Sequence, residues 1–192
     1  MVNTGIMKQA VIGLCETMRE VGHEVNAEEI ENIVEQYAIR TASTAVSQAA
    51  CGLIIGPQVN ARASTITMYE RLANAMGVRL NKGLIKEVAS SVIDNLAASA
   101  TATITAMAAI SFIPSVGRVA SVTLTSITNF CFIYVAGLIF INLVATFGVS
   151  RVENMSEEEI KRAAKSVQDN IDVKAAIKEA KKVHKATRSM IH

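Results

Sequence analysis

The sequence contains no tryptophan, and aromatic residues make up only 4% of its 192 positions. Large rings therefore cannot supply most of the close contacts. Alanine, serine, threonine, valine and isoleucine are abundant instead, and such small and β-branched side chains let helices approach closely. The apolar share of 51%, with 19% charged residues, excludes a chain that is disordered throughout. The sequence therefore predicts a folded protein in which helices pack tightly.

The start of the sequence lacks the features of a secretory leader. It has one lysine and no long apolar run followed by a small-residue cleavage site, so secretion is not expected. Val2 stands where myristoylation requires glycine. The three cysteines, Cys15, Cys51 and Cys131, are far apart and surrounded by apolar residues, which does not suggest a disulfide framework. These features are typical of a protein in a reducing compartment.

Charge is confined to the flanks of the apolar segments. Residues 41–61, 95–117 and 119–150 contain no charged side chain, whereas residues 161–192 carry nine Lys or Arg against three Asp or Glu. We therefore expect amphipathic helices at 1–40, an apolar helical core at 41–150 and charged amphipathic helices at 151–192. The formal net charge of +2 is too small to indicate nucleic-acid binding by the whole chain.

Apolar residues recur at helical spacing in the flanking segments, and no segment shows the alternation typical of a strand. Gly22 and Gly77 mark two predicted helix ends. Ser156 and Glu159 form the pattern of a capping box, and Asn26 and Glu29 form a similar pair. The sequence therefore predicts an all-α helical bundle. The expected buried stripe of the first helix is Met7, Val11, Leu14, Met18 and Val21.

The middle of the chain predicts a central apolar helical hairpin, flanked by the amphipathic helices. One helix is expected to continue to residue 113, the chain turns at 114–118, and a second arm ends at Phe147. A bilayer core of about 30 Å needs about 20 apolar helical residues, so the second arm is long enough to cross it. The residues predicted to contact the membrane are Ile110, Phe112, Pro114, Phe130, Phe132, Phe140 and Phe147.

The two arms differ in composition. The second has eleven Leu, Ile, Val or Phe residues between Phe130 and Phe147. Each is favourable by about 0.3 to 0.6 kcal/mol at mid-membrane, so this arm could insert alone. The first arm, at 97–113, is rich in serine and threonine and would need a protein partner. Asn129 and Asn142 are expected to form hydrogen bonds between helices. The alternative is a soluble bundle with both arms buried at its centre.

Three stretches carry the pattern of a known family: "GLIIGPQVNARASTITMYERLANAMGV", "LIKEVASSVIDNL" and "FIPSVGRVASVTLTSITNFCFIYVAG". They resemble an uncharacterised helical domain that follows the nucleotide-binding domain of some bacterial GTPases and occurs in YcjF-type inner-membrane proteins. The resemblance spans residues 50–148 and implies a membrane-associated helical module, with a GTPase as a candidate partner. The sequence departs from the family at Met76-Gly77, where the family has an aromatic residue before glycine, and by lacking an acidic residue after Pro57. No G-x-x-x-x-G-K-[ST] loop is present, so nucleotide hydrolysis is not implied.

The sequence shows no constellation of catalytic residues. His23, His184 and His192 have no cysteines or carboxylates at ligand spacing, so neither a metal nor another cofactor is expected. Cys51 and Cys131 have no predicted histidine neighbour, and burial is the better interpretation of both. The sequence therefore predicts a protein that is not an enzyme.

A basic stripe lies near the end of the chain, beneath an apolar helix face. Such a helix can lie on anionic lipid, and an ordinary solvated face is the alternative. Nucleic acid is not an expected partner because no aromatic platform accompanies the lysines. The stripe consists of Lys174, Lys178, Lys181 and Lys185, and the apolar face of Ile177, Ala180 and Val183.

These patterns predict a non-enzymatic, membrane-associated helical interaction or scaffold module that self-associates through small-residue helix faces. Membrane lipid and further copies of the chain are the expected partners. One alternative is a pore-forming or membrane-perturbing effector with a stored hydrophobic hairpin, and another is a soluble helical partner of a separate GTPase. The expected location is the bacterial cytoplasmic membrane with both termini cytoplasmic, because cations flank the hairpin. The cytoplasm is the alternative location.

Overall fold

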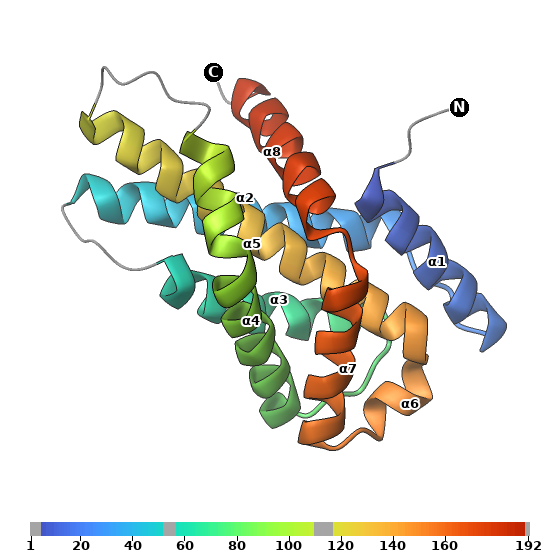
Figure 1. The fold of residues 1–192 in the computed structure, drawn as a ribbon. Helices are drawn as coiled ribbons and strands as arrows, with labels where there is room; N and C mark the ends of the chain where they lie inside the picture. Colours follow the sequence, from blue (N-terminus) through green and yellow to red (C-terminus); the bar gives the residue numbers. More distant parts are fainter. Residues whose placement is uncertain (1–4, 52–56, 110–116, 191–192) are drawn as a thin grey trace.

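The structure is a computed structural model that describes residues 5–51, 57–109 and 117–190, with side chains at 5–48, 51, 59–98 and 124–187. Within these ranges the chain forms helices and no strand, which confirms the predicted all-α bundle (Figure 1). The described helices are α1 (Ile6–Glu20), α2 (Ala27–Ala50), α3 (Pro57–Ala75), α4 (Lys82–Ala109), α5 (Gly117–Phe147), α6 (Val149–Glu153), α7 (Glu157–Asn170) and α8 (Val173–Met190).

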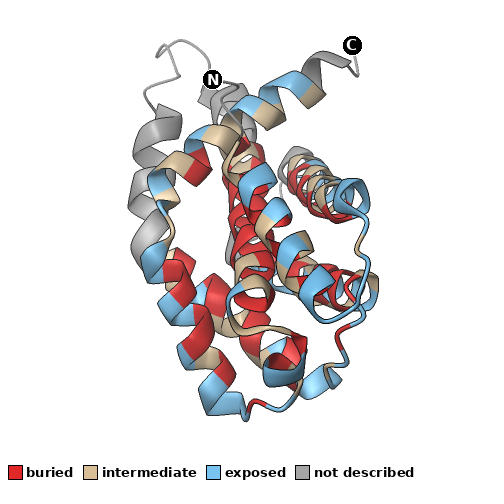
Figure 2. Cartoon of the chain, turned by 90° about the vertical axis from the view of Figure 1, so that its right-hand side faces the viewer, coloured by how far each residue is buried: buried red, intermediate tan, exposed pale blue. Residues whose placement is uncertain are grey.

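Helix α5 occupies the centre of the bundle. It packs most extensively against α2, which runs in the opposite direction, and it also contacts α1, α3, α4, α7 and α8 (Figure 1). Figure 2 shows buried residues on the inward sides of the surrounding helices and exposed residues on their outward sides. The amphipathic patterns of the flanking helices are explained by this arrangement, because their apolar faces pack against α5.

Local signals in the sequence give the correct helix ends. Gly22, Gly77 and Gly148 have φ values of +77°, +70° and +75°, a backbone conformation that glycine adopts without a Cβ penalty. Ser156 and Glu159 form the complete capping box at the start of α7. The Asn26 side chain accepts a hydrogen bond from the Glu29 backbone N–H at 3.2 Å at the start of α2.

The predicted stripe of α1 is correct except at its last member. Met7, Val11, Leu14 and Met18 are buried, but Val21 is 54% exposed. Because α1 ends at Glu20, Val21 is no longer carried on the helix face that packs against the bundle. The prediction that Val21 is buried is therefore wrong.

The predicted hairpin corresponds to α4 and α5, which contact each other. Helix α5 ends at Phe147, as predicted. The turn and the predicted residues Ile110, Phe112 and Pro114 lie outside the described residues. Helix α2 continues from Ala27 to Ala50, so the predicted boundary at residue 40 falls inside one helix.

Candidate functional site

The candidate site is the apolar part of α5 with the side chains that cover it. In the described part of the chain, Leu124–Phe147 is the helix that is long and apolar enough to cross a membrane. Of its most apolar 18-residue window, 78% is buried inside the bundle. Phe130, Phe132 and Phe140 are buried, whereas Phe147 is partly exposed. In this conformation the predicted membrane-contacting phenylalanines on α5 therefore pack mainly against their own chain.

Helix α2 packs directly against α5 at Gly137. A Cβ atom added at Gly137 would lie 2.7 Å from both Cγ atoms of Val34. Such distances are far below van der Waals contact, so the absence of a side chain at Gly137 lets the two helices meet. Ala38, Ala42 and Ala45 are also buried on α2. These small residues are therefore already used within the chain, and self-association through small-residue faces stays a prediction.

Helix α3 holds α5 through an aromatic contact and a hydrogen bond. The rings of Tyr69 and Phe140 stack with their centroids 4.4 Å apart. The Tyr69 hydroxyl donates to the Ala136 carbonyl at 2.8 Å. Burial raises the pKa of Tyr69. A buried phenol that donates one hydrogen bond and does not ionise at neutral pH is well suited to packing, and it is not activated for acid-base chemistry.

Glu179 of α8 joins three helices and was not identified from the sequence. Its carboxylate accepts hydrogen bonds from the backbone N–H groups of Ile6 at 2.5 Å and Met7 at 3.1 Å, at the start of α1. The Tyr134 hydroxyl of α5 donates to the same carboxylate at 2.9 Å. An anion at a helix N-terminus satisfies unpaired N–H groups and complements the helix dipole. The sequence offered one signal: Glu179 is an acidic residue among lysines, next to Ala180 on the predicted apolar face of the helix.

The predicted hydrogen bonds between helices from Asn129 and Asn142 are not the ones that form. Asn129 Nδ2 donates to the Thr125 carbonyl at 2.9 Å, and Asn142 Nδ2 donates to the Leu138 carbonyl at 2.8 Å. Both bonds lie within α5, because an asparagine can reach the carbonyl one turn earlier. Buried Asn129 Oδ1 has no hydrogen-bond partner among the described residues. The interpretation of these asparagines as interhelical donors is therefore wrong.

The basic stripe of α8 lies at the surface, but its apolar face does not. Lys174, Lys178 and Lys185 are exposed, and Lys181 is partly buried, which lowers its pKa. On the opposite face Ile177 and Ala180 are buried and Val183 is partly buried, because α8 packs on α5. In this conformation the apolar half of an amphipathic lipid-binding helix is therefore already covered, and only its cations are available.

The described residues contain no group of three or more potential metal ligands. Cys131 is buried on α5, as predicted, whereas Cys51 is exposed just after the end of α2, so the prediction that Cys51 is buried is wrong. Burial raises the pKa of Cys15. The His184 ring lies edge-on to Phe130, with centroids 5.0 Å apart, and its Nε2 is 3.4 Å from Ser126 Oγ. Cys15, Cys131 and His184 therefore have identifiable packing roles and do not form a nucleophile with an adjacent base.

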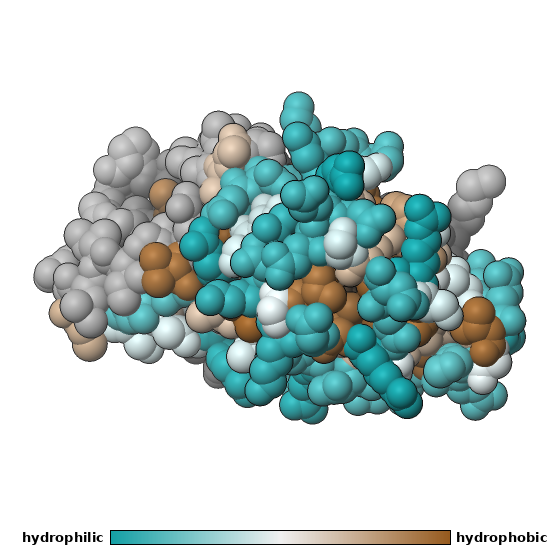
Figure 3. Space-filling model, turned by 90° about the horizontal axis from the view of Figure 1, so that it is seen from below, coloured by the Kyte–Doolittle hydropathy of each residue, from teal (hydrophilic) through white to brown (hydrophobic). Residues whose placement is uncertain are grey.

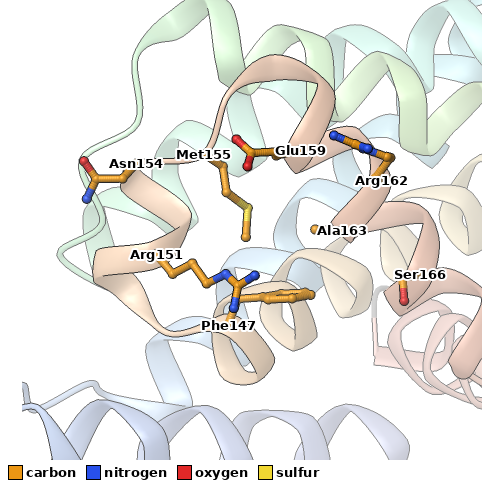
Figure 4. A pocket seen from close by; sticks show the side chains of 8 residues that line it. All are labelled: Phe147, Arg151, Asn154, Met155, Glu159, Arg162, Ala163 and Ser166. Atoms are coloured by element: carbon orange, nitrogen blue, oxygen red, sulfur yellow. The ribbon is translucent and has the colours of Figure 1, made fainter.

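A concave pocket of about 380 Å³ lies where α5 ends and α6 and α7 begin. Phe147, Met155 and Ala163 contribute apolar atoms to its lining. The guanidinium of Arg151 lies 5.4 Å from the centroid of the Phe147 ring, and Figure 4 shows the two side chains stacked at the edge of the pocket. Sequence reasoning did not identify this pocket, because its residues come from three helices.

The polar lining of this pocket contains two cations and one anion. Figure 4 shows Glu159 and Arg162 at the same edge of the pocket, and Asn154 and Ser166 complete the polar lining. Glu159 is held by Ser156, whose N–H and hydroxyl donate to its carboxylate at 2.9 and 2.7 Å. These hydrogen bonds, and secondarily the charges of Arg162 and Arg151, lower the pKa of Glu159. The lining therefore carries a net charge of +1 at neutral pH.

Comparisons of the chain with family models, with curated proteins and with solved structures find no match. The resemblance to the GTPase-associated helical domain therefore stays a prediction.

Proposed function

We propose that this chain is a non-enzymatic, membrane-associated helical module that stores an apolar helix inside its bundle and delivers it to a bilayer. The proposal rests on one observation: a helix long and apolar enough to cross a membrane is covered by the other helices of the same chain. Leu124–Phe147 has 24 residues, or about 36 Å of helix, which exceeds the roughly 30 Å of a bilayer core. Its cover consists of the surrounding helices, whose described exposed residues are mostly polar.

The hydrogen bonding of α5 supports its transfer between the two environments. Thr128, Asn129 and Asn142 donate to carbonyls one turn earlier in α5 itself, so these donors keep their partners when the helix moves. The described ties from α5 to other helices include the hydrogen bonds of Ala136 with Tyr69 and of Tyr134 with Glu179. Release of α5 therefore requires the loss of these interhelical hydrogen bonds. The donors of Thr128, Asn129 and Asn142 would keep their hydrogen bonds within α5 in lipid.

The surface of the bundle is consistent with a stored helix. The face in Figure 3 is largely hydrophilic, with separate small hydrophobic areas at its centre and toward its left and right sides. The large hydrophobic residues described as exposed are Ile12, Val21 and Val59. Ile12 lies on α1, Val21 directly follows α1, and Val59 lies on α3. Stable membrane association therefore calls for a rearrangement that uncovers α5.

A tryptophan reporter tests the proposal, because the natural chain contains none. Ile127 lies on α5 and is partly buried, so Ile127→Trp places a single indole on the proposed span. The matched control is Tyr37→Trp, at a partly buried position of α2. Each full-length variant is mixed with vesicles containing lipids that are brominated along the acyl chains. We expect quenching of the indole at position 127 and little quenching of the one at position 37.

Two outcomes contradict the proposal. Equal, weak quenching at both positions, with the protein recovered in the supernatant, favours a soluble helical module that keeps α5 covered. This second function is favoured by the burial of 78% of the apolar window. Strong quenching together with rapid release of a dye trapped in the vesicles favours the pore-forming alternative over a scaffold, because a scaffold leaves the vesicles sealed.

A further inference from the structure

We propose that the pocket at the end of α5 binds the phosphate group of an anionic phospholipid. The proposal rests on the proposed membrane association. It starts from the position of the pocket, which includes Phe147, the last residue of the apolar span, and Arg151, one turn beyond it. The pocket is formed while α5 is still packed against α7, so a phosphate bound there would hold the end of the span at the depth of the lipid phosphates before the span enters the hydrocarbon core.

The chemistry of the pocket fits a phosphate ester with an apolar part. Arg151 and Arg162 reach it from different helices, and a guanidinium offers paired N–H donors that match phosphate oxygens. Neither guanidinium makes a salt bridge to a carboxylate within 4 Å in the described part of the chain. Arg162 donates its Nε–H to the Glu158 carbonyl at 3.3 Å, which leaves its terminal N–H groups for an anion.

The remaining lining explains how the ligand would be oriented. Phe147 and Met155 give one part of the cavity an apolar surface, which suits the glycerol carbons and the first acyl methylenes. Stacking on Phe147 limits the motion of Arg151. Glu159 opposes an anion, but its carboxylate is engaged by Ser156, and two arginines outnumber it. The phosphate would therefore lie between the two guanidinium groups, with its alkyl part toward Phe147.

The test measures binding of the full-length chain to vesicles by sedimentation. Vesicles of equal parts phosphatidylglycerol and phosphatidylcholine are compared with vesicles of phosphatidylcholine alone. The double variant Arg151→Gln/Arg162→Gln should bind the anionic vesicles about 30-fold more weakly than the natural chain, from the loss of two cations near the membrane surface. The matched control is Lys178→Gln/Lys185→Gln, which removes two exposed cations of α8 that do not line the pocket and should weaken binding less than the arginine pair does.

Two further variants separate a shaped site from general attraction. Arg151→Lys/Arg162→Lys keeps the charge but loses the paired donors, so it should bind more weakly than the natural chain. Glu159→Gln removes the opposing charge and should bind anionic vesicles more tightly. Far-UV circular dichroism and thermal melting check that each variant is folded. Equal weakening by the arginine and lysine pairs, or no effect of Glu159→Gln, would overturn the proposal in favour of diffuse adsorption.

The source of the phosphate is tested separately, with glycerol 1-phosphate and inorganic phosphate in solution. Shifts of the arginine Nε–H signals with these soluble anions, without a preference for anionic vesicles, would show a site for a soluble phosphate ester and overturn the lipid assignment. The tryptophan experiment distinguishes this failure from failure of the proposed function. If position 127 is quenched in every vesicle and the arginine variants bind normally, membrane insertion stands and the pocket proposal fails.

Discussion

Tyr69 allows one buried hydrogen bond between α3 and α5 to be removed while the packing stays. The side chain is fully buried, its hydroxyl donates to Ala136 O, and its ring stacks on Phe140. Tyr69→Phe keeps the ring and loses only the hydroxyl. The Ala136 carbonyl retains its place in the hydrogen-bonded ladder of α5, so it is not left without a partner. We expect the free energy of unfolding at pH 7 to fall by about 1 kcal/mol, the usual net value of such a bond.

The difference in stability between the natural chain and Tyr69→Phe should depend on pH, whereas the effect of a simple packing defect should not. Burial raises the pKa of Tyr69 above its ordinary value of 10.0. The unfolded chain therefore loses this proton at lower pH than the folded chain does. Stability from the neutral phenol is complete below about pH 10 and falls above it, by up to about 1.4 kcal/mol per pH unit. The phenylalanine variant lacks this loss.

The two proteins should therefore change order in stability. Below pH 10 the natural chain is more stable, and between about pH 10.5 and 11 the variant becomes equal to it and then more stable. Urea unfolding followed by far-UV circular dichroism at pH 7, 9, 10 and 11 measures the difference. Effects of other groups on both proteins cancel in this difference. A constant difference across the series would refute the reasoning, because it would mean that Tyr69 ionises equally in the folded and unfolded states.

Two other contacts of α5 give predictions that urea unfolding also measures. Gly137→Ala should cost about 1 to 3 kcal/mol, because the new Cβ would lie 2.7 Å from Val34. Val34→Ala should then be less damaging in that variant than in the natural chain, and equal damage in both would argue against the clash. Glu179→Ala should cost about 2 to 4 kcal/mol, because the N–H groups that start α1 lose their acceptor and the Tyr134 hydroxyl loses its partner. Tyr134→Phe should cost at least about 1 kcal/mol less in the Glu179→Ala background, and no coupling would contradict the three-helix junction.

The features that could be predicted are those whose physics is contained in a few adjacent residues. The capping box of Ser156 and Glu159 is an example, because both partners are set by a spacing of three. The left-handed glycines Gly22 and Gly77 are others. The buried stripes of the flanks also follow from spacing alone, since a helix can bury only one side against a neighbour. Val21 fails because its position depends on where the helix stops.

The features that could not be predicted depend on residues that the fold brings together. Glu179 meets Ile6 and Met7 across more than 170 positions, and no spacing rule relates them. The two arginines of the pocket share a cavity only because α6 turns the chain between α5 and α7. The asparagines of α5 show the opposite error, since a local partner was available and the prediction assumed a distant one. A carbonyl one turn earlier always lies within reach, whereas an interhelical partner needs a matching group on the neighbour.

The environment of α5 is the feature on which the sequence is least informative, for a physical reason. A helix apolar on all sides meets the same requirement in lipid and in a protein core, namely that no unpaired polar group is exposed to an apolar medium. The deciding quantity is the free energy with which the surrounding helices pack against α5. That quantity depends on the residues of α1, α2, α3, α4, α7 and α8 as well as on α5. Variants that weaken the cover without changing the span, such as Glu179→Ala, should therefore increase quenching of the indole in Ile127→Trp by vesicle lipids. A decrease would mean that the intact bundle itself binds the membrane.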